Sequence, residues 1–231
     1  MVEQTGVPVT AEYLIEQEGA VARAKAIAAL GLVSRGLHFE LFHISDADRV
    51  ALTRELGERG TSLGEEPEIR RQAETDARRQ LHLFQQELGV QPLHISTHGN
   101  FNLDAKGEVM QWWNDLMNEL FDGNPPVMQL NLPHVRHNLY SWNTDAMRRS
   151  PRSPEEFARE LRSVPGHEPV EFVLHPALPE KGDVSLNMLF DTQMRIADLE
   201  SAINIIRSGV IESAGFEIVP VTELQQRARA A

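Results

Sequence analysis

The chain contains no cysteine, and this absence excludes both disulfide bonds and thiolate metal sites. Any metal ion must therefore be held by histidine, carboxylate or carbonyl oxygen. No apolar run approaches the length that crosses a membrane, and the first residues lack the basic and apolar regions of a secretory signal peptide. These absences predict a cytoplasmic protein without a membrane partner.

Basic residues are scarce relative to acidic ones. The chain has 22 lysine and arginine residues against 34 aspartate and glutamate residues, which gives a formal net charge of −12. This balance argues against nucleic acid as the main partner, because phosphate backbones attract basic surfaces. The chain is 231 residues long and 41% hydrophobic, so it can bury a sizeable core, and one domain spanning 1–231 is expected.

Strand and helix patterns alternate along the chain. The patterns predict strands at 7–15, 33–41, 92–98, 127–132, 170–174 and 216–221, and helices at 20–30, 47–56, 67–88, 108–121, from 153 onward, and at 191–207. Such alternation indicates an α/β fold in which crossover helices link parallel strands. Two stretches that follow strands, 42–66 and 133–151, are expected to be loop insertions.

Three histidines lie where a predicted strand ends. His38, His98 and His175 occur in the segments 36–41, 94–100 and 172–176. In a barrel of parallel strands, the carboxyl ends of the strands gather at one mouth, so distant residues can meet around one metal ion or substrate. Histidine is the commonest metal ligand and the commonest acid or base near neutral pH.

Residue spacing within the strands predicts that further polar residues share a face with these histidines. Residues i and i+2 of a strand face the same side, so His38 and Glu40 are expected to point together, as are His94, Ser96 and His98. For each histidine taken alone, an ordinary half-buried residue that has found its hydrogen bonds is the favoured interpretation. The recurrence at successive strand ends favours a common site.

The stretch 133–151 carries two aromatic residues, Tyr140 and Trp142. Aromatic rings stack on the apolar faces of sugars, while polar neighbours bind hydroxyl groups, so this stretch predicts a carbohydrate-binding loop. The alternative interpretation is an ordinary surface loop anchored by its tryptophan.

Three sequence blocks and a later helix occur in a fixed order. They are Gly36-Leu37-His38-Phe39-Glu40-Leu41, then Gly89-Val90-Gln91-Pro92-Leu93-His94-Ile95-Ser96-Thr97-His98-Gly99-Asn100, then Glu171-Phe172-Val173-Leu174-His175-Pro176-Ala177, and finally Arg195 with Asp198-Leu199. In this order, from about Gly6 to the C-terminus, the chain resembles the YdjC-like (ChbG/HpnK) family of carbohydrate deacetylases.

The resemblance implies a distorted TIM-like (β/α) barrel that removes acetyl groups from N-acetylated amino sugars. It implies a divalent cation, zinc or magnesium, with His38 and His98 among its ligands. His175 would protonate the leaving amine or stabilise the tetrahedral intermediate, and Arg195 would contribute to substrate binding. Tyr140 and Trp142 would then hold the sugar.

The chain also departs from the family pattern. The family opens with a strand ending in Asp-Asp-Phe-Gly, which nothing here matches, so the barrel is expected to be incomplete at its N-terminus. In the second block, Ser96 stands where the family has aspartate, and Asn100 where it has histidine. Glu40 is the best replacement for the missing carboxylate ligand. The alternative, which is somewhat favoured, is that Glu40 only pairs with a cationic side chain or hydrogen-bonds a loop.

These departures leave two further expectations open. A barrel without its first strand would expose unpaired backbone along 7–15 and 216–221, and such edges invite pairing in a homodimer. The alternative to a deacetylase is a catalytically impaired relative that binds a sugar or a partner protein.

Overall fold

The computed structural model of this protein describes residues 5–29, 31, 33–42, 44, 46–98, 101–128, 137–140, 151–166, 168–174 and 192–230. The chain forms two compact units. The larger unit comprises 9–134 and 220–231, and the smaller unit comprises 1–8 and 135–219. Each unit is described by itself.

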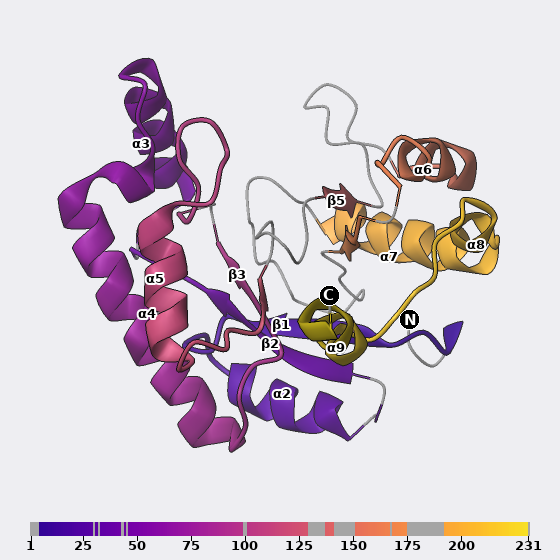
Figure 1. Cartoon of the computed structure of the whole chain (residues 1–231), viewed down its shortest axis with the longest axis horizontal. Helices are drawn as coiled ribbons and strands as arrows, with labels where there is room; N and C mark the ends of the chain where they lie inside the picture. Colours follow the sequence, from indigo (N-terminus) through magenta and orange to yellow (C-terminus); the bar gives the residue numbers. More distant parts are fainter. Residues whose placement is uncertain are drawn as a thin grey trace. The chain divides into compact units, whose positions relative to one another are not determined.

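The larger unit is built on a four-stranded parallel sheet (Figure 1). Its strands are β1 (Val9–Tyr13), β2 (Val33–Phe39), β3 (His94–Thr97) and β4 (Val127–Met128), which lie side by side in that order. Its helices are α2 (Ala20–Ala28), α3 (Asp46–Glu58), the 3-10 helix η1 (Leu63–Glu65), α4 (Pro67–Leu88), α5 (Gln111–Leu120) and α9 (Val221–Ala230). The predicted parallel α/β arrangement is therefore confirmed for this unit.

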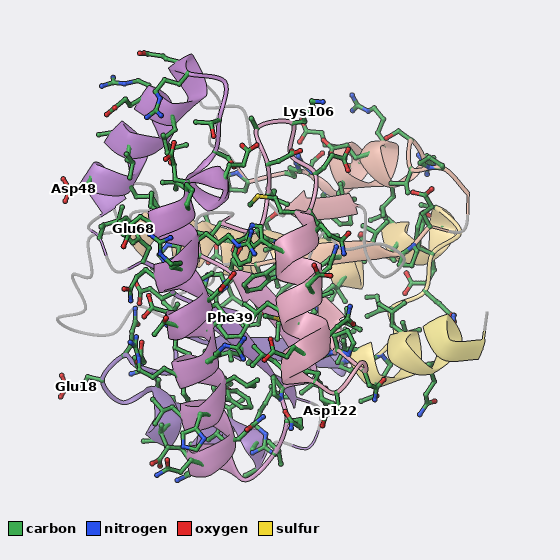
Figure 2. The ribbon with its side chains drawn as sticks, turned by 60° about the vertical axis from the view of Figure 1, so that its left-hand side comes forward. Glu18, Phe39, Asp48, Glu68, Lys106 and Asp122 are labelled. Atoms are coloured by element: carbon green, nitrogen blue, oxygen red, sulfur yellow. The ribbon has the colours of Figure 1, made fainter. Side chains whose placement is uncertain are left out.

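One face of this sheet is apolar and is covered by helices. Leu37, Phe39 and Ile95 lie on it and are almost fully buried. The ring of Phe39 meets that of Trp113 in α5 edge to face, with centroids 5.6 Å apart. Figure 2 looks onto α4 and α5, with Phe39 labelled between them. Burial of this layer anchors the sheet.

Helix α4 follows directly from its sequence. Pro67 occupies its first turn, where a missing backbone N–H costs nothing, and Gly89 ends it with a left-handed φ of 66°. The apolar positions that the sequence placed on one stripe are buried, namely Ile69, Ala73, Ala77, Leu81 and Phe84. The helix has the bounds that were predicted for it.

The smaller unit has its own two-stranded parallel sheet. Strand β5 (His137–Tyr140) pairs with β6 (Val170–Val173), and helices α6 (Pro154–Leu161), α7 (Thr192–Arg207) and α8 (Val210–Ser213) complete the unit. Helix α6 begins with the predicted capping box, in which Ser153 Oγ accepts a hydrogen bond from the Glu156 N–H and the Glu156 carboxylate accepts one from the Ser153 N–H.

The prediction of a strand at 216–221 is wrong. Residues 216–220 belong to no sheet, and α9 begins at Val221. Phe216 and Ile218 instead pack against the small core around Phe157 and Ile205. Alternating apolar residues produce the same sequence pattern whether the extended segment pairs with a strand or only packs through its side chains.

The stretch 133–151 was expected to be a loop insertion, yet it contains strand β5. The rest of that stretch, 133–136 and 141–150, lies outside the described residues. The other expected insertion, 42–66, contains α3 and η1. None of the helices that the structure describes is long and apolar enough to cross a membrane.

Candidate functional site on the polar face of the larger sheet

The second face of the larger sheet carries polar side chains. The register aligns Glu12 with Gly36 and Gly36 with His94, and it aligns His38 with Ser96. Aligned residues of parallel strands project from the same face, as do residues two positions apart. We call the group formed by Glu12, His38, His94 and Ser96 the polar cluster. His94 and Ser96 both contact Glu12, so they share a face as their spacing predicted.

The carboxylate of Glu12 is the centre of the polar cluster. Its Oε1 lies 2.5 Å from His94 Nδ1, and its Oε2 accepts a hydrogen bond of 2.5 Å from Ser96 Oγ. Ser96 Oγ in turn lies 2.5 Å from His38 Nδ1. His38 Nδ1 and Glu12 Oε2 are 3.7 Å apart. One carboxylate on β1 therefore connects two histidines on β2 and β3 through direct and serine-mediated contacts.

The surroundings of Glu12 favour its charged form. Burial alone would raise the pKa of this carboxyl group, but the charge of His94, the hydrogen bond from His94 and the charge of the nearby His38 lower it, and the net pKa is well below the usual range. His94 and Ser96 are only 5% and 4% exposed. The cluster is therefore a partly desolvated anion surrounded by hydrogen-bond donors.

Gly36 makes room for this carboxylate. A Cβ at position 36 would lie 2.7 Å from Glu12 Cγ and 3.0 Å from the carbonyl oxygen of His94. Both distances are shorter than ordinary van der Waals contact. The glycine of the first sequence block thus lets a glutamate on β1 reach across β2 to β3.

The sequence pattern did not identify Glu12 as a site residue, because Glu12 lies outside the blocks that contain the histidines. Its contacts with His94 and Ser96 span 82 and 84 positions of the chain. A detectable signal was present, because β1 is a half-buried strand and a lone glutamate there needs a partner. What the sequence could not provide was the strand order that puts His94 and Ser96 beside it.

A second polar group lies next to His38, where β2 and β3 end. The rings of His38 and His98 have centroids 5.5 Å apart. His98 Nδ1 is 3.8 Å from Glu40 Oε1, and the guanidinium Nη2 of Arg49 in α3 is 3.2 Å from His98 Nε2. Burial lowers the pKa of Arg49 while Glu40 raises it, and an arginine side chain keeps its charge in either situation.

His38, Glu40 and His98 are the residues predicted to hold a metal ion. Two imidazoles and one carboxylate fit a divalent cation in their chemistry. Across the described segments, however, no three ligating side chains are spaced to hold one. The positive charge of Arg49 against His98 opposes a second cation at the same place, so the donor set predicts weak binding.

Helix α4 fixes the backbone where Glu40 leaves the sheet. Gln80 is buried, and its side-chain amide accepts a 3.0 Å hydrogen bond from the Glu40 N–H and donates one of 2.6 Å to the Glu40 carbonyl. One turn earlier, the buried Asp76 carboxylate accepts a 3.0 Å hydrogen bond from the Phe42 N–H. Phe42 has a left-handed φ of 54°, which is strained for a non-glycine residue.

The remaining predicted site residues belong to the smaller unit. Tyr140 lies in β5 and Arg195 in α7, and their backbones alone are described. Trp142 and His175 lie outside the described residues. Their roles therefore stay predictions.

Comparison with known proteins gives information on the fold. No family model matches the chain, and no curated protein matches it. Among solved structures, one from Enterococcus faecalis, provisionally named a cellobiose-phosphate cleavage protein, matches with a TM-score of 0.59. The match covers 96% of this chain and 90% of that chain at 16% sequence identity. At this identity the likeness shows a shared α/β fold and does not by itself transfer an activity.

Proposed function

We propose that this chain is a carbohydrate-processing hydrolase of the YdjC-like type, which removes acetyl groups from N-acetylated amino sugars with the help of a divalent cation. The observation that carries the proposal is the polar cluster on one face of the parallel sheet, next to Glu40 and His98, which follow the carboxyl ends of β2 and β3. The sequence blocks and the fold shared with a protein named for cleaving a sugar phosphate support the carbohydrate class. We further propose the distorted TIM-like (β/α) barrel that the resemblance to this family implies.

His38, His98 and Glu40 would hold the cation, with zinc or magnesium as candidates. When bound, such a cation would polarise the acetamide carbonyl and lower the pKa of a water molecule. In the same proposal, His175 protonates the leaving amine, Arg195 contributes to substrate binding, and Tyr140 with Trp142 holds the sugar ring.

Zinc titration by calorimetry tests the metal-binding part of the proposal. We expect weak binding by the unmodified chain, no binding after His98→Ala, and affinity at least about tenfold lower after Glu40→Gln, because each change removes one donor. His82→Ala is the matched control, since His82 is exposed on α4 and away from the polar face. If the unmodified chain takes up no zinc, the binding-module alternative replaces the enzyme.

Sugar binding tests the substrate class separately. We expect N-acetylglucosamine oligomers to bind at concentrations on the order of millimolar, which corresponds to a binding free energy of about −4 kcal/mol. Trp142→Ala should weaken that binding by removing a stacking ring. No binding by the unmodified chain, or equal binding by both chains, would contradict the proposed role of the loop.

A specific contact favours the alternative of a catalytically impaired relative. Arg49 Nη2 lies 3.2 Å from His98 Nε2. The guanidinium group therefore occupies the position where a metal ion bound to Nε2 would lie. We expect Arg49→Gln to raise zinc affinity at least about tenfold, because it removes a fixed positive charge next to the cation. Arg54→Gln, an exposed position on the same helix, should leave the affinity unchanged. Equal affinities in all three chains would show that Arg49 does not compete.

A further inference from the structure

The hydrogen bonds of the polar cluster determine which atoms carry protons. Glutamate is ionised near neutral pH, so both oxygens of Glu12 can only accept hydrogen bonds. The hydroxyl proton of Ser96 is directed at Glu12 Oε2. A serine hydroxyl has one proton, so its contact of 2.5 Å with His38 Nδ1 requires that His38 be the donor.

The same reasoning applies to His94. Its Nδ1 lies 2.5 Å from Glu12 Oε1, and an ionised carboxylate cannot donate, so Nδ1 must carry the proton. Both imidazoles therefore have their protons on Nδ1. In a neutral imidazole this arrangement makes Nε2 the acceptor atom.

We infer that Glu12 is a positioning residue that acts through Ser96 to hold His38 in the Nδ1–H tautomer, with Nε2 presented to a ligand. The identity of that ligand as a divalent cation rests on the proposed function, whereas the tautomer does not. Ligating histidines commonly donate their second ring N–H to an acceptor, which orients the ring and raises its basicity. The relay from His38 through Ser96 to Glu12 has this form.

Two independent features show that the relay is built into the sheet. Gly36 leaves the space through which Glu12 crosses β2, since a Cβ there would lie 2.7 Å from Glu12 Cγ. The register aligns Ser96 of β3 with His38 of β2, so the two side chains leave the sheet on the same face. Glu12 therefore brings a carboxylate from β1, across β2, to the hydroxyl that contacts His38.

Long-range proton–nitrogen NMR spectra of the metal-free protein test the inference, recorded at a pH where the imidazoles are neutral. We expect His38 and His94 of the unmodified chain to show the Nδ1–H tautomer. Glu12→Gln should shift His38 toward the Nε2–H tautomer, which is intrinsically favoured in histidine, and should disturb His94 as well. Glu18→Gln, at an exposed position after β1, should change neither ring.

Ser96→Ala removes the serine-mediated contact between His38 and Glu12 but keeps the direct contact between His94 and Glu12. This variant also tests the inference if the Glu12 variant fails to fold. His38 should then shift toward the Nε2–H tautomer, whereas the tautomer of His94 should not change, because His94 contacts Glu12 directly. The inference is overturned if His38 of the unmodified chain is the Nε2–H tautomer, or if neither substitution changes it.

Zinc calorimetry on the same variants adds a second measurement. If zinc binds, Glu12→Gln and Ser96→Ala should lower its affinity about 10- to 100-fold, the usual effect of removing such a supporting partner. Unchanged affinity in both variants would overturn the positioning role and leave the proposed function standing. Absence of zinc binding in the unmodified chain would contradict the proposed function, while the NMR result would still decide the inference.

Discussion

Gly36→Ala is expected to lower the free energy of unfolding by about 3 kcal/mol, because it combines overpacking with the loss of buried hydrogen bonds. The added Cβ would lie 2.7 Å from Glu12 Cγ and 3.0 Å from the backbone oxygen of His94. The side chain of Glu12 can move, but only by leaving His94 and Ser96 without their acceptor. Urea unfolding of the two proteins measures the difference.

Gly57→Ala is the matched control for this experiment. Gly57 lies in α3, and a Cβ there would meet no atom within 4 Å. Alanine also favours helix over glycine by up to about 1 kcal/mol, so this variant should be as stable as the unmodified chain or slightly more stable. Equal stability of the Gly36→Ala protein would mean that Glu12 does not cross the sheet at Gly36.

Gln80→Met should destabilise the protein by about 2–4 kcal/mol, since it removes both hydrogen bonds from the buried Gln80 to the partly buried N–H and C=O of Glu40 while nearly preserving volume. Gln80 supplies hydrogen bonds of 3.0 and 2.6 Å to these two backbone groups. The loss should also weaken zinc binding, because Glu40 is held in place through this contact.

Gln86→Met provides the comparison, because Gln86 is exposed on the same helix. That variant should differ from the unmodified chain by less than about 0.5 kcal/mol, as is usual for surface substitutions. Thermal or urea unfolding distinguishes the two variants. If both substitutions have the same small effect, the hydrogen bonds between Gln80 in α4 and the backbone of Glu40 contribute no stability.

Local signals explain what the sequence predicted well. Helix α4 was predicted with its observed bounds because Pro67 begins it, an apolar stripe runs along it and Gly89 follows its last residue. The capping box of Ser153 and Glu156 was predicted because its two members are three residues apart. Signals of this kind are complete within a few turns of chain, so no knowledge of the tertiary fold is needed.

Features that depend on the order of the strands in the sheet could not be predicted from local sequence signals. The role of Glu12 requires that β1 lie beside β2 and that Gly36 leave space for the Glu12 side chain to cross β2. The segment 216–220 has the alternation of a strand, but its apolar residues pack on a core without pairing. The contact of Arg49 with His98 joins a helix to the end of a strand 49 positions away. Each outcome is decided by tertiary neighbours, which sequence periodicity does not encode.

The proposed function depends on the binding of a divalent cation by His38 and His98 at the polar face of the larger sheet. Crystals of the unmodified protein soaked in zinc, with anomalous scattering recorded on both sides of the zinc absorption edge, test this binding. We expect an anomalous peak in contact with the imidazoles of His38 and His98, which disappears in crystals of the His98→Ala protein. Zinc bound only elsewhere on the surface, or a peak that survives this substitution unchanged, would contradict it.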